Sequence, residues 1–210
     1  MKTRLFAVGD IHGCFEQLKE LVENQLILNR TDKLVFLGDY IDRGTKSKEV
    51  VDFIINLKTN GYNITSLLGN HEQMLLDAYC DENNISLWMQ NGGAETLNSF
   101  HIKSPKEIDE KYIDFLKNLP YYFSSAEFLF VHAGFNDNAI DPYEDKYSMI
   151  WNSTKYYSNS LLIDKTIIHG HRPITLNSCI QRVMTKQKVI NIDTGCVYKD
   201  KEGYGKLTAM

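Results

Sequence analysis

The sequence predicts an α/β protein with a parallel sheet, because three strand patterns alternate with three helical patterns in its first third. Each expected strand is a short apolar run, and each is followed by a segment with apolar residues at helical spacing. A repeated strand–helix order implies parallel strands with helices on the faces of the sheet. In chain order, the expected strands are residues 4–9, 33–38 and 63–69, and the expected helices are residues 14–27, 48–61 and 72–80.

The helices and the later strands follow from spacing and end signals. The second helix is expected to end at Gly61, because glycine readily adopts the left-handed conformation that closes a helix. Residues 81–118 have the pattern of polar helix, anchored by Trp88 and the stretch "NGGAETL". Strand patterns then return, and no repeat or linker divides the chain, so one domain covering residues 1–210 is expected. The later expected strands lie within residues 121–135, 165–171, 178–185 and 187–195.

Composition and charge exclude several classes of protein. Of the 210 residues, 43% are hydrophobic and 24% are charged, as in an ordinary globular protein. A formal net charge of −4 argues against nucleic acid as a partner. No apolar run reaches the roughly 18 residues of a membrane span, and Asp10 interrupts the first apolar stretch too early for a signal peptide. The four cysteines form no CxxC pair, so we expect free thiols and a cytoplasmic protein.

Polar side chains follow the first three expected strands at the point where each ends, in "GDIHG", "GDYIDRG" and "GNHE". In open parallel sheets, ligands bind beyond the carboxyl ends of the strands. Carboxylates and imidazoles suit Mn²⁺, Fe or Zn²⁺, and a carboxylate is the best bridge between two ions. The residues brought to this edge are Asp10, His12, Asp39, Asp42, Arg43, Asn70 and His71, joined by His132, His169 and His171 from later strands.

Each of these motifs has an ordinary structural interpretation when it is taken alone. A Gly-Asp pair at a strand end is usually a turn, and an isolated buried histidine is more often hydrogen-bonded core than a ligand. "GNHE" is also compatible with a helix start, with Asn70 as the cap and Glu72 in the first turn. The metal site is favoured because all the motifs occur together, each directly after a strand pattern.

Taken together, "GDIHG", "GDYIDRG", "LLGNHE", "VHAG" and "HGH" resemble the phosphoprotein phosphatase branch of the calcineurin-like metallophosphoesterases. The resemblance runs from Arg4 to the end, where "NIDTGCVY" and "GYGKLTA" look like the last strands of the family. It implies a β-sandwich of two mixed sheets flanked by helices, built on the βαβαβ metal scaffold. A chain of this length resembles the compact bacterial and phage serine/threonine phosphatases and the related symmetric diadenosine tetraphosphate hydrolase.

The resemblance implies two divalent metal ions as cofactors, with Mn²⁺ expected and Fe or Zn²⁺ as alternatives. A water that bridges the two ions would attack phosphorus directly, without a covalent phosphoenzyme. His169 would lie beside the metal ligands without binding an ion. The implied ligands are Asp10 and His12 for the first metal, Asp39 as the bridge, and Asn70, His132 and His171 for the second metal.

The resemblance also implies the groups that act on the substrate. His71 would protonate the leaving oxygen while Asp42 orients it, and Arg43 and Asn70 would contact the phosphoryl group. Two positions depart from the family pattern, because Leu68 and Ser153 stand where protein phosphatases of this branch usually have arginines. Arg172, directly after His171, is a candidate to replace one of these phosphate contacts.

The sequence therefore favours a metal-dependent phosphomonoesterase that hydrolyses phosphoserine, phosphothreonine or related phosphoesters. The expected partner is a phosphoprotein or small phosphoester substrate, with no nucleic acid and no membrane, and the chain is expected to be a monomer. Two alternatives stay open. One is a symmetric dinucleoside polyphosphate hydrolase, since such hydrolases also tend to have leucine at the position of Leu68. The other is a catalytically weak module that binds phosphorylated partners.

Overall fold

A computed structural model describes residues 3–210, so the first two residues of the expected 1–210 domain lie outside the described part. The first sheet has the order β1-β2-β3 and is parallel, as the sequence predicts. Two helical connections join its strands. The elements are β1 (Leu5–Val8), α1 (Phe15–Lys19) continuing as the π-helix η1 (Glu20–Gln25), β2 (Lys33–Phe36), α2 (Ser47–Thr59) and β3 (Asn63–Ser66).

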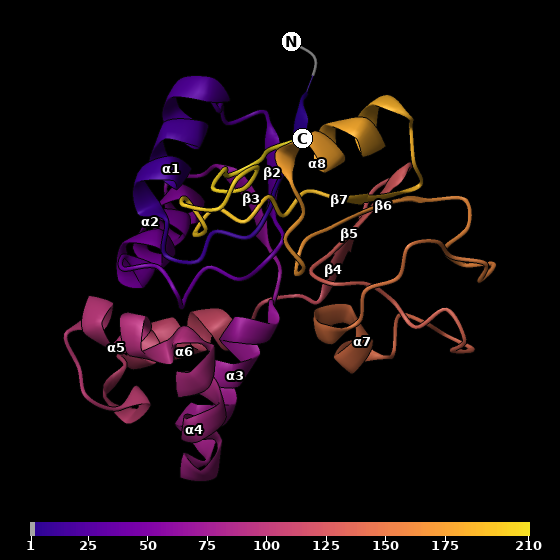
Figure 1. The fold of residues 1–210 in the computed structure, drawn as a ribbon. Coiled ribbons are helices and arrows are strands. Elements are labelled where there is room, and N and C mark those ends of the chain that lie inside the picture. The colour runs from indigo at the N-terminus through magenta and orange to yellow at the C-terminus, as the bar shows by residue number, and fades with distance from the viewer. Residues whose placement is uncertain (1–2) are drawn as a thin grey trace.

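The second sheet has the order β4-β5-β6-β7. Strands β4 and β5 pair antiparallel, whereas β5, β6 and β7 pair parallel, so this sheet is mixed. Figure 1 shows the two sheets side by side, with α1 and α2 outside the first sheet. The elements are β4 (Tyr122–Ser124), β5 (Phe128–Val131), α7 (Lys146–Trp151), β6 (Thr166–His169), α8 (Leu176–Met184) and β7 (Val189–Asn191).

Strand alternation explains how two cores form around the first sheet. Successive side chains of a strand point to opposite faces, so Leu34 and Phe36 pack with the residues of α1 and α2. Val35, between them, packs instead between the two sheets, against Phe130 and Ile168 of the second sheet. Because both faces of β2 are buried, its sequence is a continuous apolar run. The α/β sandwich expected from the sequence is confirmed.

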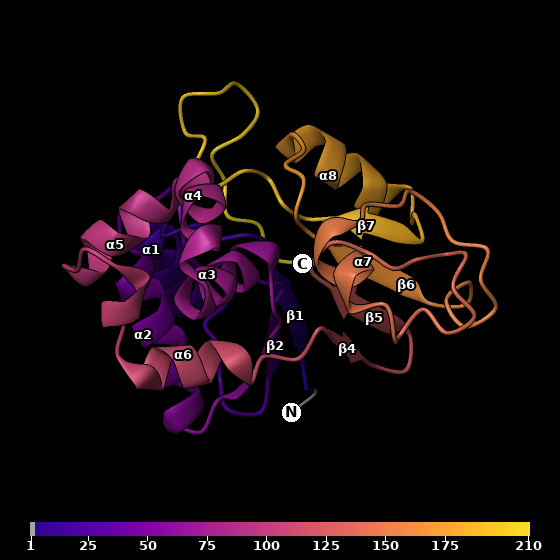
Figure 2. The ribbon, with the colours of Figure 1, turned by 90° about the horizontal axis from the view of Figure 1, so that it is seen from below.

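The chain between β3 and β4 forms a helical lobe, as expected for residues 81–118. Figure 2 shows its helices grouped together beside the first sheet. The lobe kinks at Gly92, whose φ of +105° is accessible mainly to glycine. Its elements are α3 (Asn70–Cys80), η2 (Glu82–Asn84), α4 (Ile85–Trp88), η3 (Met89–Gly93), α5 (Ala94–Phe100), η4 (Pro105–Glu107) and α6 (Glu110–Lys117).

Two expectations for the last third are wrong. Residues 178–184 lie in helix α8, with Thr185 directly after its end, and do not form a strand. Their β-branched residues suggest a strand, but Cys179, Ile180 and Val183 continue a helical period, and the Thr175 hydroxyl accepts a hydrogen bond from Ser178 N at the helix start. The "GYGKLTA" stretch is not a regular strand either. It meets the edge of the first sheet at an antiparallel bridge between Val8 and Ala209, and Ala7 N and Gly9 N donate to the carbonyls of Met210 and Thr208.

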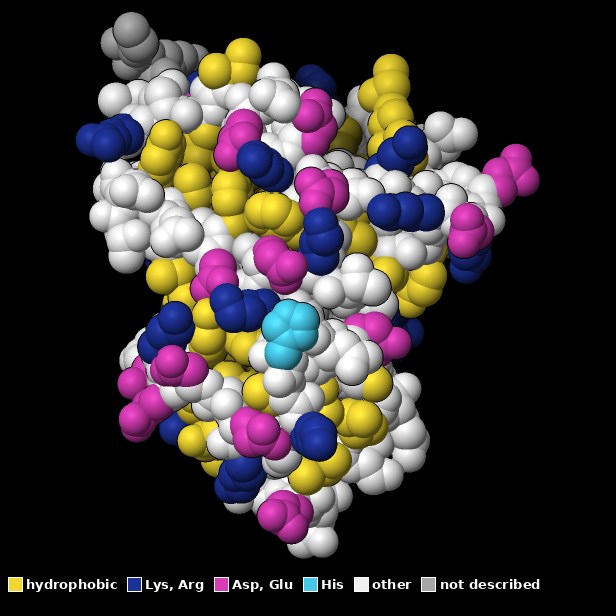
Figure 3. All heavy atoms as spheres, turned by 90° about the vertical axis from the view of Figure 1, so that its left-hand side faces the viewer, with side chains coloured by type: hydrophobic (Ala, Val, Ile, Leu, Met, Phe, Trp, Pro, Cys, Tyr) yellow, Lys and Arg dark blue, Asp and Glu magenta, His cyan; other side chains and the backbone are white. Residues whose placement is uncertain are grey.

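The surface over α1, α2 and the lobe carries acidic and basic side chains that are interspersed rather than gathered by sign (Figure 3). This face therefore offers no broad basic field of the kind that nucleic acids bind. Within residues 3–210, no helix combines the length and apolar character needed to cross a membrane.

Candidate metal centre

The loops that follow β1, β2, β3, β5 and β6 meet at one edge of the sandwich. Their backbone is unusually strained, because most of the described non-glycine residues with positive φ lie in these loops. Left-handed backbone is costly for residues with a Cβ, and such strain clusters at functional sites. The loop residues in this conformation are His12 (φ 47°), Asp39 (53°), Asp42 (69°), Arg43 (66°) and His171 (73°).

Asp39 lies at the centre of the site with its two carboxylate oxygens directed at different histidines. Its Oδ2 is 3.5 Å from His12 Nε2 and 4.0 Å from His71 Nε2. Its Oδ1 is 3.4 Å from His132 Nε2. Burial acts to raise the pKa of Asp39, but the surrounding imidazoles outweigh burial and lower it, so the carboxylate is charged. Asp39 therefore faces two separate groups of possible metal ligands.

One of these groups brings together atoms that carry lone pairs. Asn70 Oδ1 lies 2.9 Å from His132 Nε2 and 2.9 Å from His171 Nδ1, and the two histidine nitrogens are 3.2 Å apart. His132 donates its Nδ1 hydrogen to the Leu37 carbonyl, so its Nε2 presents a lone pair. Burial lowers the pKa of His132, and burial lowers that of His171 to about 3, so both rings are neutral. A divalent cation fits among these acceptors.

The other group contains His12, Asp39 and His71. His12 donates from Nδ1 to the Ile41 carbonyl at 2.9 Å, which leaves its Nε2 for a metal ion. The Arg43 guanidinium donates to that same Nε2 at 2.8 Å. The two uses of this lone pair exclude each other, so Arg43 has to move aside when His12 binds a metal.

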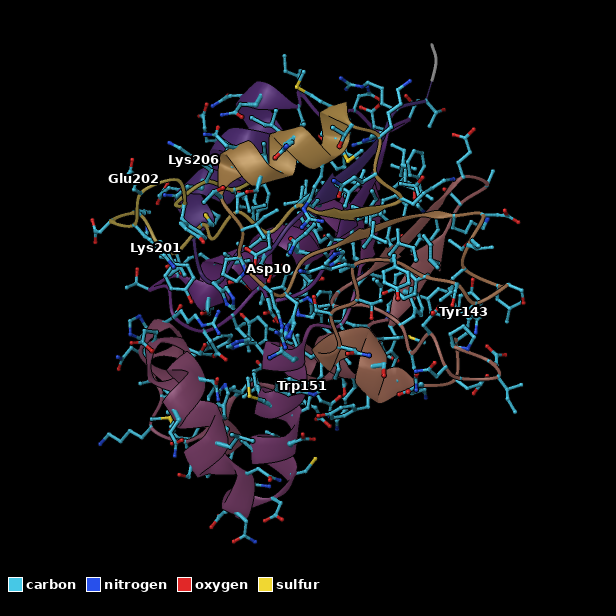
Figure 4. The ribbon with its side chains drawn as sticks, turned by 45° about the vertical axis from the view of Figure 1, so that its right-hand side comes forward. Asp10, Tyr143, Trp151, Lys201, Glu202 and Lys206 are labelled. Carbon is cyan, nitrogen blue, oxygen red and sulfur yellow. The ribbon has the colours of Figure 1, made fainter. Side chains whose placement is uncertain are left out.

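Asp10 lies at the same edge but outside both compact groups. Its carboxylate accepts hydrogen bonds from His171 N at 3.0 and 3.2 Å, and Gly170 is needed because a Cβ there would lie 2.0 Å from Asp10 Oδ1. Burial, together with the nearby carboxylates of Asp193 and Asp39, raises the pKa of Asp10. This concentration of buried carboxylates favours a bound cation. Figure 4 shows Asp10 at the centre of the molecule, with Trp151 of α7 just below it.

His71 belongs to a buried hydrogen-bonded network built around Asp42. Its Nδ1 donates to Asp42 Oδ2 at 2.7 Å. Trp88 Nε1 donates to both Asp42 oxygens at 3.1 and 3.0 Å, and the Thr96 hydroxyl donates to Asp42 Oδ1 at 2.6 Å. Sequence reasoning misses Trp88 and Thr96 as site residues. In the sequence, both residues lie in the stretch "WMQNGGAET", and this stretch on its own indicates only a structural anchor.

Glu72 and Asp193 are also missed as site residues by sequence reasoning. The Glu72 carboxylate accepts hydrogen bonds from Asp39 N at 2.8 Å, Tyr40 N at 2.7 Å and Gly69 N at 3.0 Å. It therefore joins the loops after β2 and β3 and fixes the backbone of Asp39. The signal for Glu72 is its place in "GNHE", where the sequence suggests only a role at the start of a helix.

The other positions singled out from the sequence lie in different surroundings. Leu68 is 3% exposed and packs in the core beside the helices, so it does not reach the metal centre. His169 is buried, and its Nδ1 donates to the Gly170 carbonyl at 3.1 Å. Ser153 and Arg172 line a small cavity together with His169, and Arg172 directly follows His171 of the metal centre.

The fold and the site together define the class of protein. An α/β sandwich whose strand-end loops gather a central carboxylate between two groups of imidazole ligands is a metallophosphoesterase architecture. The sequence model of the family described as "Calcineurin-like phosphoesterase" matches residues 3–198, and the chain belongs to that family.

Named relatives within the family differ in activity. Serine/threonine-protein phosphatase 2 of Salmonella typhimurium is 33% identical over 141 residues, which are 65% of this chain and 61% of that protein. The symmetrical bis(5'-nucleosyl)-tetraphosphatase of Bordetella pertussis is 33% identical over 135 residues, which are 64% of this chain and 44% of that protein. The chain thus spans less than two thirds of the length of both relatives.

A solved structure confirms the fold. The protein serine/threonine phosphatase from Saccharomyces cerevisiae superposes with a TM-score of 0.68 at 18% sequence identity. The match covers 96% of this chain and 70% of that chain. At this identity the likeness concerns the architecture of the sandwich and not its substrate.

Proposed function

We propose that this protein is a metal-dependent phosphomonoesterase that hydrolyses phosphoserine, phosphothreonine or related phosphoesters. The observation that carries the proposal is the position of Asp39, with one oxygen directed at His12 and His71 and the other at His132. A carboxylate in this position suits two divalent ions, for which Mn²⁺ is the first candidate.

The protein's own groups have distinct roles in this proposal. Asp10, His12, Asp39, Asn70, His132 and His171 would hold the metals. Two bound ions would supply an activated water and neutralise charge on the phosphoryl group. His71 holds a proton on Nδ1 toward Asp42 and turns Nε2 toward Asp39, so a protonated ring would donate to the leaving oxygen. The Arg43 guanidinium points into the site and would bind phosphoryl oxygens through its planar fork.

The test is turnover of p-nitrophenyl phosphate and of a phosphothreonine peptide, before and after removal of metal with EDTA. We expect hydrolysis with Mn²⁺, no hydrolysis after EDTA, and recovery when Mn²⁺ is added again. Full activity in a sample verified to be free of metal would contradict the proposal. Comparison of Mn²⁺, Zn²⁺ and Fe²⁺ would rank the candidate ions.

A second candidate function is symmetric hydrolysis of dinucleoside tetraphosphates. It is favoured by the similarity to the Bordetella pertussis tetraphosphatase. It is also favoured by Leu68, a buried leucine at the position where protein phosphatases of this branch usually have a phosphate-binding arginine. Product analysis separates the two functions. Release of two nucleoside diphosphates from diadenosine tetraphosphate, faster than phosphate release from the peptide, would favour this second function.

A further inference from the structure

A small cavity that begins directly after His171 has three cationic residues in its lining. Its volume is about 240 Å³, and three of its lining residues are Lys155, Arg172 and Arg182. Ser153 and Thr154 add hydroxyl groups to the lining, and none of the described residues around the cavity is acidic. A cavity of this size has room for one small group, and its lining suits an anion.

Among the described residues, no carboxylate neutralises the three cations that line the cavity. Within residues 3–210, none of them forms an ion pair with a carboxylate. Arg182 Nη1 donates to the neutral Gln187 side chain at 3.2 Å. Unpaired cations that face one cavity repel each other, and a bound anion would relieve this repulsion.

Two segments of the chain connect this cavity directly with the metal centre. Arg172 follows His171, and this turn is fixed because Arg172 N donates to the Gly170 carbonyl at 3.0 Å and Asn191 Nδ2 donates to the Arg172 carbonyl at 2.8 Å. The second segment runs from Trp151, whose ring centroid is 6.1 Å from that of His171, to Ser153 in the cavity wall. The cavity wall is therefore joined to His171 by the chain through Arg172, and by a ring contact through Trp151.

We propose that this basic cavity is a subsite for a second phosphate group of the substrate, adjacent to the phosphate that is hydrolysed. The preferred substrates are then phosphoesters that carry a further phosphate next to the reacting one. Phosphate is favoured over carboxylate because it carries up to two negative charges and accepts the forked hydrogen bonds of two arginines. This inference rests on the proposed function, since the metal centre is taken as the place of hydrolysis.

The experiment compares tripolyphosphate with inorganic phosphate as inhibitors of p-nitrophenyl phosphate hydrolysis by the Mn²⁺-loaded full chain. The readout is the ratio of the two inhibition constants in the wild type and in a Lys155→Gln/Arg182→Gln variant. We expect the variant to raise the inhibition constant for tripolyphosphate by roughly tenfold or more relative to that for phosphate, because charge-assisted hydrogen bonds are lost. An unchanged ratio would overturn the proposal.

A matched control removes two positive charges elsewhere. Lys201 and Lys206 are labelled on the C-terminal loop beside the start of α8, away from Asp10 and Trp151 (Figure 4), and neither lines the cavity. The Lys201→Gln/Lys206→Gln variant should keep the wild-type ratio of inhibition constants. If the ratio changes as much as in the cavity variant, the loss of tripolyphosphate binding comes from the lower net charge of the protein and not from the cavity. Chelation of Mn²⁺ by tripolyphosphate affects all three proteins equally.

The same variants separate this proposal from the proposed function. If the wild type hydrolyses no p-nitrophenyl phosphate, the proposed function fails, but calorimetric titration with tripolyphosphate still tests the cavity. Weaker binding by the cavity variant than by the wild type and the control variant would support the subsite. Equal binding by all three proteins would overturn it.

Discussion

His71 and Asp42 form a buried pair, with His71 Nδ1 2.7 Å from Asp42 Oδ2. The hydrogen bond fixes the orientation of the imidazole and leaves its Nε2 on the side of Asp39, 4.0 Å from Oδ2. A histidine held in this way can either donate a proton or bind a metal through Nε2. The two roles predict different properties for variants of His71.

Replacing His71 with asparagine should separate acid catalysis from metal binding. If His71 is a general acid, His71→Asn should lower kcat by roughly 10²–10⁴-fold while the metal content stays the same. The loss should be smaller for p-nitrophenyl phosphate than for a phosphopeptide, because p-nitrophenolate leaves without a proton. Metal analysis beside the kinetics decides the assignment, and loss of an ion from the variant would make His71 a ligand.

The pH dependence of Asp42→Asn tests the pairing. Burial acts to lower the pKa of His71, but the carboxylates of Asp39 and Asp42 outweigh it and raise that pKa. The protonated ring is therefore present to higher pH in the wild type, and kcat should fall as pH rises through this pKa. Removal of the Asp42 charge lowers the pKa, so the alkaline fall in kcat should move to lower pH. A profile that does not move would contradict the role of Asp42.

Asp39→Asn tests the central position of this carboxylate. Asp39 is the only side chain proposed to bind both ions, so the variant should bind less metal and lose most of its activity. The amide keeps the size of the carboxylate and removes the charge that attracts the cations. Stoichiometry by elemental analysis and turnover with Mn²⁺ provide the measurement. A variant that holds two ions with full activity would exclude a bridging role.

The sequence was sufficient to predict the first sheet and the residues that meet at its edge. Alternation of strand and helix patterns is a local signal, and parallel pairing brings the strand ends together without further information. The position of Asp39 beside His12 and His71 follows from that topology, whereas His132 and His171 come from the second sheet, and the bridging place of Asp39 was implied by the family resemblance. The same local reasoning failed at residues 178–185, where residue type suggested a strand although the apolar spacing was helical.

The contacts that support the site could not be predicted because they join distant parts of the chain. Asp42 meets Trp88 and Thr96 only when the helical lobe packs against the loop after β2. Glu72 binds the backbone of the same loop across more than thirty positions of sequence. Such contacts depend on tertiary packing, and a single sequence offers no periodic signal for them. Leu68 is a similar case, because its burial in the helical core is set by tertiary structure.

Arg43→Ala tests the phosphate-binding role of the guanidinium. Charge-assisted hydrogen bonds of this type contribute about 1.5–3 kcal/mol, so kcat/KM for a phosphomonoester should fall by about 10- to 150-fold. Because Arg43 donates to the Nε2 of His12, its removal should leave metal affinity unchanged or raise it. Arg43→Lys, which keeps the charge without the fork, should recover only part of the loss. If kcat/KM is unchanged in Arg43→Ala, the Arg43 guanidinium does not bind the phosphoryl group of the substrate.

Trp88→Phe tests whether the helical lobe positions the catalytic pair. Trp88 is fully buried, and its Nε1 donates to both oxygens of Asp42. The Trp88 ring packs against Gly93, so phenylalanine keeps an aromatic ring there but removes the donor, which leaves Asp42 with fewer hydrogen bonds. We expect kcat to fall by about tenfold or more, since a hydrogen bond to a charged group contributes about 1.5–3 kcal/mol. Thr96→Val removes the other donor to Asp42 and should act in the same direction.

A purely structural role for Trp88 would give a different pattern. If Trp88 acts through Asp42 and His71, then adding Trp88→Phe to His71→Asn should lower kcat no further, because the group that it positions is already absent. If Trp88 only supports the fold, its effect on kcat should be the same in both backgrounds. The smaller ring leaves a cavity in the lobe, which lowers the free energy of unfolding. The thermal midpoint of each variant, measured alongside kcat, shows how large this loss of stability is. Equal effects in the two backgrounds would therefore remove Trp88 from the positioning of the pair.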